Sequence, residues 1–262
     1  MTPNFIVPDL ADKGIYIASE STFYRVLKES HQLTSRARAK PRNSAKRPYA
    51  QCANAPNSVW TWDISYLPST VKGRHFYLYM ITDIFSRKIV GAEVYEQELG
   101  DYAAQLLQKT LWKERCLQSS VVLHSDNGSP MRSFTMVAKM QELGVISSYS
   151  RPRVSNDNPY SEALFRTVKY HRTWPIKGFS TINEARSCVF HFCNWYNHEH
   201  KHSGIKFVTP HERHSGMDAE ILDRRVDVYQ NARKRNPERW SQNTRNWKFI
   251  TAVFLNPEKE VA

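Results

Sequence analysis

The stretch from His124 to Lys169 constrains the fold most, because it carries a strand end and a helix start. Asp126 follows a short, apolar, β-branched run, and Asn127 with Gly128 can turn the chain directly after it. A run of this kind is typical of a buried strand, and Asn-Gly is a strong turn signal. We therefore expect Asp126 at the exit of a buried strand.

The other end of this stretch has the features of a helix. Asn158 can cap it, and Pro159 suits the first helical position. With 3.6 residues per turn, Glu162, Arg166 and Lys169 share one face, while mostly apolar residues occupy the opposite side. The helix should bury that side and present an acid beside two cations.

A third acid lies upstream, in residues 59–68. Apolar and aromatic residues alternate there with Thr61, Asp63 and Ser65, which predicts a strand with Asp63 near its middle. If this strand pairs with the one before Asp126, the two aspartates can converge, and the helix can add Glu162.

Three carboxylates in one place repel one another, and their pKa values rise unless a cation holds them together. Oxygen ligands alone favour a hard ion such as Mg²⁺ or Mn²⁺. Two such ions, about 3.5–4 Å apart, can promote displacement at a phosphodiester. The acids therefore predict a two-metal site that acts on nucleic acid.

These residues also carry a resemblance to a known family. Asp63, Asp126 and Glu162, with 35 residues between the last two, resemble the catalytic triad of DDE transposases and retroviral-type integrases. The words around them are similar to those of second-reading-frame transposases of the bacterial insertion-sequence-three family, and the likeness extends over roughly residues 15–257, including 194–203. The words are Trp-Asp-Ile-Ser-Tyr-Leu-Pro, His-Ser-Asp-Asn-Gly and Asn-Asp-Asn-Pro-Tyr-Ser-Glu.

The resemblance implies an α/β fold of the ribonuclease H-like type, a mixed five-stranded sheet with flanking helices. It also implies cleavage of double-stranded DNA at the inverted-repeat ends of an element, followed by strand transfer into target DNA. The expected assembly is a homodimer or larger, and an upstream reading frame can supply a partner or a fused segment. A DNA-binding repressor, an inactive remnant and a related nuclease that does not join DNA remain alternatives.

Composition agrees with a nucleic-acid partner. The chain has 37 Lys and Arg against 25 Asp and Glu, a net charge of +12, which attracts polyanions, although such charge can also serve solubility. No apolar run approaches the roughly 18 residues of a membrane span, and the N-terminus lacks a signal-peptide pattern. The four irregularly spaced cysteines suggest reduced thiols. We expect a cytoplasmic, nucleoid-associated protein without a membrane partner.

Four regions are expected: a partial helix-turn-helix-like segment (1–35), a basic linker (36–57), the catalytic core (58–208) and a basic C-terminal extension (209–262). In the first, Ser19 can cap a second helix, but Pro8 should cut the first one short. A helix-turn-helix reads the DNA major groove. A small helical lead-in without groove contact is the alternative.

Further cations are candidates for DNA-backbone contacts. In the linker these are Arg36, Arg38, Lys40 and Arg42, unless the linker is only a solvated tether. Arg151 and Arg153 precede the Glu162 helix, in a segment that we expect to be a flexible loop beside the site; a simple surface turn is the alternative.

Within the core, the patterns predict strands at 75–83, 88–95, 121–125 and 145–149, and helices at 101–117, 131–143 and 181–197. Asp83 could mimic a catalytic acid, but we interpret it as shaping a turn with Ser86 and Arg87. Histidines 198, 200 and 202 lie near two cysteines, yet their spacing does not fit a zinc site. We expect His200 and His202 to fasten the helix end or to contact DNA.

The C-terminal extension should contain an amphipathic helix over 217–235, with its apolar side at Ile221, Val228, Tyr229 and Ala232, and a short strand near 253–257. Between them, Arg245 and Trp247 belong to a stretch of interleaved cations and indoles. Such a stretch suits phosphates and unstacked bases. Alternatively, the tryptophans attach the tail to the core.

Overall fold

The computed structural model describes residues 3–32, 49–117, 119–151 and 157–257. The chain divides into two compact units, residues 1–45 and residues 46–262. The basic residues expected to contact DNA in the linker, together with Arg153, lie outside the described residues; those of the linker are Arg36, Arg38, Lys40 and Arg42.

The N-terminal unit contains two helices, α1 (Pro3–Asp12) and α2 (Glu20–Glu29). The Ser19 side chain accepts a hydrogen bond from the Thr22 N–H at 3.4 Å, which confirms the predicted cap. The prediction that Pro8 cuts the first helix short was wrong, because α1 continues through it. Pro8 lies in the second turn, so it removes only one hydrogen bond, to a carbonyl of the first turn. Contact with a DNA groove stays a prediction.

The second unit is built on a mixed five-stranded sheet with strand order β4-β3-β2-β5-β6. Its strands are β2 (Val59–Pro68), β3 (His75–Asp83), β4 (Ile89–Tyr95), β5 (Val122–Ser125) and β6 (Ile146–Tyr149). The first three form an antiparallel meander, whereas β5 and β6 run parallel to β2. This is the predicted ribonuclease H-like arrangement, and it is confirmed.

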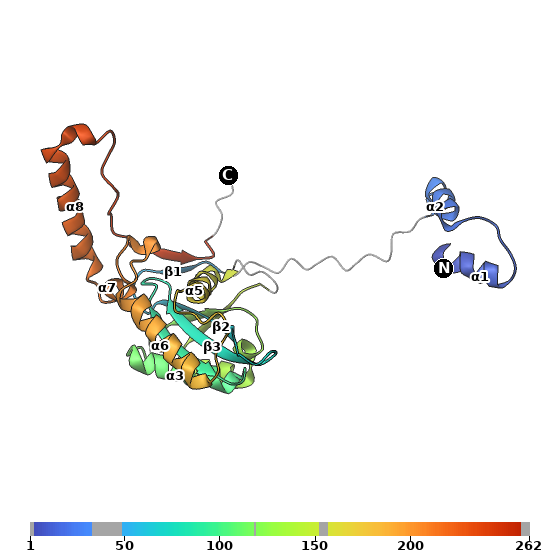
Figure 1. Ribbon diagram of the computed structural model, residues 1–262, viewed down its shortest axis with the longest axis horizontal. Coiled ribbons are helices and arrows are strands. Elements are labelled where there is room, and N and C mark those ends of the chain that lie inside the picture. The colour runs from blue at the N-terminus through green and yellow to red at the C-terminus, as the bar shows by residue number, and fades with distance from the viewer. Residues whose placement is uncertain (1–2, 33–48, 118, 152–156, 258–262) are drawn as a thin grey trace. The chain divides into compact units, whose positions relative to one another are not determined.

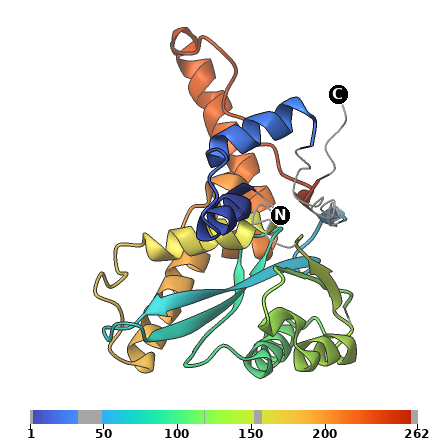
Figure 2. The same ribbon diagram turned by 90° about the vertical axis from the view of Figure 1, so that its right-hand side faces the viewer.

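Helices cover both faces of this sheet (Figures 1 and 2). The helices are α3 (Gly100–Lys113), α4 (Phe134–Glu142), α5 (Pro159–Lys169) and α6 (Ile182–His198). Trp60 and Trp62 of β2 pack into a core with α3 and α4, while Leu67, on the other face, packs with α5 and α6. The predicted alternation along β2 is therefore confirmed, with Asp63 on the face of α5 and α6.

Two predicted helices have different bounds. The helix expected over 101–117 ends at Lys113. The helix expected over 131–143 is divided into a 3₁₀ turn, η1 (Pro130–Arg132), and α4. The division follows from Ser133, which has extended backbone angles and accepts a hydrogen bond from the Met136 N–H at 3.2 Å. Ser commonly caps helices in this way.

Asp83 shapes the turn between β3 and β4, as predicted. Its carboxylate is fully buried, and the backbone N–H and the hydroxyl of Ser86 both donate to it at 2.7 Å. The Asn57 N–H donates to its other oxygen, also at 2.7 Å. The oxygens of Asp83 are thus occupied by the fold and are not available for chemistry.

The remaining elements are η3 (Ser203–Ile205), α7 (Pro210–His214), α8 (Asp218–Arg235), η4 (Pro237–Arg239), β7 (Val253–Leu255) and β1 (Gln51–Ala53). Strands β1 and β7 pair antiparallel in a second, two-stranded sheet, and Ala53 and Leu255 are fully buried. The predicted linker and C-terminal extension therefore meet in a small sheet packed beside β2. The linker's basic composition ends at Arg47, before this strand begins.

Helix α8 confirms the helix predicted over 217–235, but its one buried apolar residue is Leu222. Val228, placed on the apolar side by the sequence pattern, is 64% exposed, and Ala232 is exposed as well. The side of α8 that packs on the tail and η3 carries Ile221, Leu222 and Tyr229, and Tyr229 contacts the rings of Trp240 and Trp247. Val228 and Ala232 are not part of this contact. Among the described helices, none has the length and apolar character needed to cross a bilayer.

Arg213 attaches the C-terminal segment to the sheet. Its side chain is 1% exposed and donates to the Phe85 carbonyl at 2.7 Å, to Asp218 at 2.9 Å and to the Ile250 carbonyl at 2.8 Å. The guanidinium also lies over the rings of Phe85 and Phe249. One buried cation thus joins the β3–β4 turn, α8 and the tail.

We predict that Arg213→Met lowers the free energy of unfolding by about 3–5 kcal/mol, because it leaves Asp218 buried without its partner. Urea unfolding measures the change. The matched control Arg239→Met, at an exposed position, should change stability by less than about 0.5 kcal/mol. Equal effects of the two substitutions would contradict the role given to Arg213.

Candidate active site

The pairing of β2 with β5 brings two aspartates together. The strands are parallel, with Thr61 opposite His124. Asp63 lies two residues beyond Thr61 on β2, and Asp126 lies two residues beyond His124, directly after β5. The two aspartates therefore project from neighbouring positions on one face of the sheet. Asp63 is half-buried and Asp126, directly after β5, is exposed. The predicted convergence of these two acids is present.

Asp126 is held by the turn that follows it. The Gly128 N–H donates to Asp126 Oδ1 at 2.9 Å. A Cβ on Gly128 would lie 3.0 Å from that oxygen and 2.9 Å from the Met131 sulfur, so a larger residue would displace one of them. Behind the turn, the amide of Asn127 donates to the Ser150 carbonyl. The Asn-Gly pair thus orients the carboxylate as well as turning the chain.

Buried His124 fixes β5 beside β6. Its Nδ1 lies 2.9 Å from Ser148 Oγ and its Nε2 lies 3.2 Å from Ser150 Oγ. Burial lowers the pKa of His124, so the ring is neutral at pH 7, and each ring nitrogen has a hydroxyl partner. This residue supports the strand that delivers Asp126.

Glu162 comes from the first turn of α5, which begins at Pro159 as predicted. The prediction that Asn158 caps this helix was wrong, since its side chain makes no capping hydrogen bond. Buried Asn158 instead donates from Nδ2 to the Trp62 carbonyl at 3.3 Å. This contact ties the start of α5 to the residue before Asp63.

The three acids share adjoining hollows. One, of about 470 Å³, is lined by Asp63, Glu162, Arg166 and Lys169 among others. The next, of about 440 Å³, is lined by Asp63, Asp126 and Lys169 among others. Asp63 and Lys169 border both, so the acids surround one continuous region beside the middle of β2.

The donor set suits a hard divalent ion, since it consists of carboxylate oxygens. The oxygens nevertheless do not form a closed cage: within residues 3–32, 49–117, 119–151 and 157–257, no three acidic, histidine or cysteine side chains are grouped closely enough to hold a metal. Glu162 and Asp126 are exposed, so their side chains can rotate toward Asp63. The residues therefore fit the ion in chemistry and location.

Electrostatic repulsion is evident at Asp63. Burial, together with the neighbouring charges of Asp126 and Glu162, raises the pKa of Asp63 to about 7. The Ile64 N–H, which donates to Asp63 Oδ1 at 2.8 Å, and the Lys169 ammonium act in the opposite direction. Lys169 does not fully offset the effects that raise the pKa of Asp63. A bound metal ion would favour the ionised carboxylate and so lower this pKa.

The predicted cations differ in what they do. Arg166 and Lys169 are exposed and border the acids, as their helical spacing predicts. Arg151 instead forms an ion pair with Asp157, donating from Nε and Nη2 at 3.0 Å and from its backbone N–H at 2.9 Å. This pair lowers the pKa of Asp157. Arg151 therefore braces the approach to α5, and its contact with DNA stays a prediction.

Trp247 is not available to stack on bases. It is 6% exposed and packs with Leu222 and Val208, and the guanidinium groups of Arg225 and Arg245 lie 4.9 and 4.7 Å from its ring centre. This supports the alternative in which the tryptophan attaches the tail to the core. Arg245 remains exposed, and its contact with phosphate stays a prediction.

Sequence analysis missed a fourth acid beside the site. Glu98 borders the same hollow as Asp126, and the Tyr66 hydroxyl donates to it at 2.7 Å. The hydrogen bond to Glu98 raises the pKa of Tyr66 to about 12. The sequence offers one signal, the outward position of Tyr66 on the β2 pattern. Glu98, in the connection before α3, has none.

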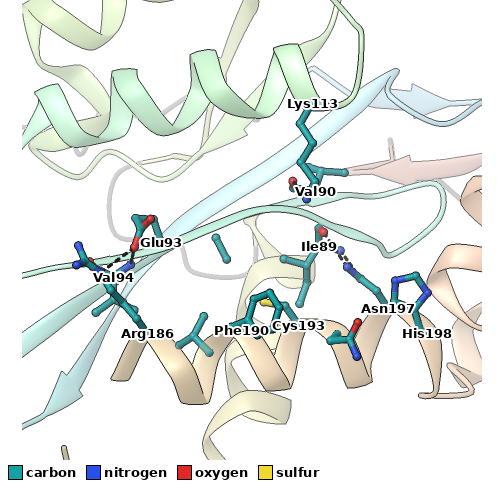
Figure 3. Close-up of a pocket in the computed structure, with 13 residues that line it drawn as sticks. Ile89, Val90, Glu93, Val94, Lys113, Arg186, Phe190, Cys193, Asn197 and His198 are labelled. Carbon is teal, nitrogen blue, oxygen red and sulfur yellow. Dashed lines mark hydrogen bonds and ion pairs between the residues drawn. The ribbon is translucent and has the colours of Figure 1, made fainter. Parts of the chain in front are cut away.

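A separate pocket of about 420 Å³ lies between β4 and α6 (Figure 3). Its polar groups close the edge of the sheet: the Asn197 side chain bonds to both the N–H and the carbonyl of Ile89, and Arg186 donates to the Val94 carbonyl. Covering an edge strand in this way prevents pairing with other chains. The pocket contains none of the three acids.

Family comparisons agree with this geometry. The integrase core domain family matches in two parts, one over residues 53–155 and one over residues 143–210. Two transposases are similar to the chain. The transposase for insertion sequence element IS904 of Lactococcus lactis is 31% identical over 159 residues, 60% of this chain and 61% of that protein. The putative transposase InsK for IS150 of Escherichia coli is 28% identical over 160 residues, 61% of this chain and 55% of that protein.

Solved structures give weaker similarity. The simian T-cell lymphotropic virus intasome aligns over 79% of this chain and 70% of its own, with 16% identity and a TM-score of 0.49. The HTLV-2 integrase catalytic core domain in complex with magnesium aligns over 61% of this chain and 97% of its own, with 13% identity and a TM-score of 0.45.

The strand order and the family matches together define the class: the chain belongs to the integrase core domain family. Within it, the chain groups with the transposases of bacterial insertion sequences of the IS3 family. It spans 55–61% of the length of the IS904 and IS150 transposases.

We predict that Asp63→Asn stabilises the metal-free protein at pH 8, by roughly 2 kcal/mol after allowance for solvent screening. The folded pKa of about 7 exceeds the model value of 3.8, so the folded state binds more protons than the unfolded state between these pH values. The stability of the wild type should therefore fall as the pH rises through this window. The Asp63→Asn variant has no titrating carboxyl at this position, so it should not lose this stability as the pH rises.

Urea unfolding in EDTA at pH 8 and at pH 4.5 measures this effect. The difference in the free energy of unfolding between Asp63→Asn and the wild type should be smaller at pH 4.5 than at pH 8. Ser65→Ala, in the same hollow, removes no titrating group, so its difference from wild type should not vary with pH. A gap for Asp63→Asn that is equal at the two pH values would contradict the raised pKa.

Proposed function

We propose that the chain is a DNA transposase that cleaves at the ends of its element and transfers the strands into target DNA through Asp63, Asp126 and Glu162. The observation that carries this proposal is the parallel register of β2 and β5, which supports neighbouring positions for the two aspartates on one face of the sheet. The Asn158 contact with β2 then brings the Glu162 helix to the same place. Membership of the integrase core family supports it.

We further propose that the three acids hold Mg²⁺ or Mn²⁺, two ions per site. Asp63 would belong to both ions, because it borders both hollows, with Asp126 and Glu162 completing the ligands on either side. Bound there, the ions would activate the attacking water or 3′-hydroxyl and stabilise the leaving oxygen at the phosphate. The raised pKa of Asp63 supports this assignment, because the ionised carboxylate is unfavourable without a counter-charge. Bound cations would favour the ionised form.

The chain's own residues then position the DNA. Lys169 and Arg166 lie one to two turns beyond Glu162 on the exposed face of α5, where they can bind the phosphates on each side of the scissile bond. The positive end of the α5 dipole favours an ionised Glu162 in the first turn.

Tyrosine does not serve as the nucleophile in this proposal. Two tyrosines, Tyr66 and Tyr170, border the acids. The hydroxyl of Tyr66 donates to Glu98, and this hydrogen bond raises the pKa of Tyr66 to about 12. The hydroxyl therefore stays protonated at neutral pH. We propose direct attack by water or by a DNA 3′-hydroxyl, with no covalent protein–DNA intermediate.

The proposed partners are double-stranded DNA ends and target DNA, held by two or more copies of the chain in the bacterial cytoplasm. The two-helix N-terminal unit supports an additional DNA contact, and the upstream reading frame would supply a partner or fused segment. A nuclease that cuts without joining could use the same acids, so the experiment must separate nicked from joined products.

We predict that Asp126→Asn lowers metal-dependent cleavage of labelled element ends at least about a hundredfold. Metal ligation supplies several kcal/mol to such reactions, and each 1.36 kcal/mol is a factor of ten in rate. Gel analysis of products with Mg²⁺ or Mn²⁺, against a chelator, measures the loss. Asp227→Asn, the same chemical change on exposed α8, is the matched control and should leave the rate unchanged.

Joined products from the wild type would support a transposase, and nicks alone would support the nuclease. Binding without metal-dependent products from any of these proteins would favour a repressor or an inactive remnant. If Asp126→Asn cleaved DNA at the same rate as Asp227→Asn, Asp126 would not be a residue of the proposed active site.

Lys169→Gln should weaken DNA binding about equally for all sequences, because it removes a phosphate contact and no base contact. The slope of log affinity against log salt should fall by about 1. Fluorescence anisotropy at several salt concentrations measures both values. Lys109→Gln, an exposed lysine on α3 across the sheet, should keep the wild-type slope. Equal slopes for the two variants would exclude a phosphate contact at Lys169.

A further inference from the structure

A second pocket, of about 260 Å³, lies on the other side of α5, between this helix, the end of β3 and the end of α6. Its polar and aromatic lining consists of one arginine, two threonines, two tyrosines and one histidine: Arg87, Thr82, Thr167, Tyr160, Tyr196 and His202. Of the described residues that line it, none is acidic. The pocket therefore contains a cation without a counter-charge on its own walls.

Arg87 is the unusual member of this pocket. Its guanidinium lies 4.0 Å from the centre of the Tyr160 ring, and its Nε and Nη1 are buried without a hydrogen-bond partner among the described residues. It forms no ion pair with any residue of that part of the chain either. Buried donors, above all charged ones, are almost always satisfied, so an orphaned guanidinium indicates a missing acceptor.

The backbone of Arg87 adds a second observation. Its φ is +67°, in the left-handed region that favours Gly and Asn. This backbone conformation costs free energy for an arginine but not for a glycine, which has no Cβ. The cost of an arginine at this turn is explained if its side chain is needed there.

The other walls suit an oxyanion. Tyr196 is buried, and its hydroxyl makes no hydrogen bond to a described residue; burial raises the pKa of Tyr196, so the hydroxyl is a protonated donor. His202 has its pKa lowered to about 4 by burial and by Arg87, so it is neutral at pH 7, and its Nδ1 accepts from the Gly204 N–H. Arg87 is thus the one formal charge among the described lining residues, next to a free hydroxyl donor.

We propose that this pocket is a binding site for a single phosphate group, held by Arg87 with the Tyr196 hydroxyl. Its volume lies below the range typical of pockets for larger organic ligands, which favours one small group. Arginine suits phosphate because its planar donors match the anion's oxygens. The phosphate can be a free ion or part of a DNA backbone. Since α5 carries Glu162 on another face, the bound phosphate would steady the catalytic helix.

Calorimetric titration of the full chain with inorganic phosphate tests this site, in EDTA and at constant ionic strength. Arg87→Asn keeps the left-handed turn and removes the cation, so it should weaken binding at least about tenfold. Tyr196→Phe keeps the packing, removes one donor and should weaken binding by a smaller factor. Arg239→Asn, on the exposed surface, is the matched control and should bind like the wild type. No catalysis is measured, so failure of the proposed transposase activity would not affect the result.

Location is tested in crystals equilibrated with selenate, which replaces phosphate and is found by anomalous scattering. A selenium peak within hydrogen-bond reach of the Arg87 guanidinium supports the site. Loss of phosphate binding with unchanged DNA affinity in Arg87→Asn identifies a free ion as the ligand, whereas parallel loss of DNA affinity identifies a backbone phosphate. Selenate only at exposed basic residues, or wild-type phosphate affinity in folded Arg87→Asn and Tyr196→Phe, would overturn the proposal.

Discussion

The parallel pairing of β2 with β5 is the interaction on which the candidate site depends. It sets Thr61 opposite His124, and the equal rise of two parallel strands then carries Asp63 and Asp126 to neighbouring positions. A slip of one residue would turn one aspartate to the opposite face of the sheet. Buried tryptophans on the other face of β2 resist such a slip, because they would lose their place in the core. The hydrophobic pattern of one face thereby fixes the chemistry of the other.

The same geometry creates an electrostatic conflict that the fold tolerates. Burial and the two neighbouring acids raise the pKa of Asp63 to about 7, and Lys169 offsets only part of this effect. The rest of the structure is arranged to keep the acids in place: Asn158 ties α5 to β2, and His124 ties β5 to β6. Local destabilisation at a functional site, supported by well-satisfied surroundings, is common in enzymes. A site in this state is prepared for cations and for the phosphates that accompany them.

Most of the core could be predicted from sequence because its signals are local. The alternation of residues 59–68 and the apolar stripe of α6 each report burial directly. The failures involve contacts between distant segments. The side chain of Asn158 suits a cap, yet a carbonyl on β2 competes for it successfully. The pairing of β1 with β7 and the approach of Glu98 to the site likewise depend on tertiary packing, which no local pattern records.

The most direct test of the central claim is the position of Mn²⁺ in crystals of the chain, located by anomalous scattering at saturating metal. The account predicts two ions bonded to carboxylate oxygens of Asp63 and Asp126, with Glu162 turned inward to complete the second. Two ions should lie about 3.5–4 Å apart. Manganese bound only elsewhere, with the three carboxylates still separated, would contradict it.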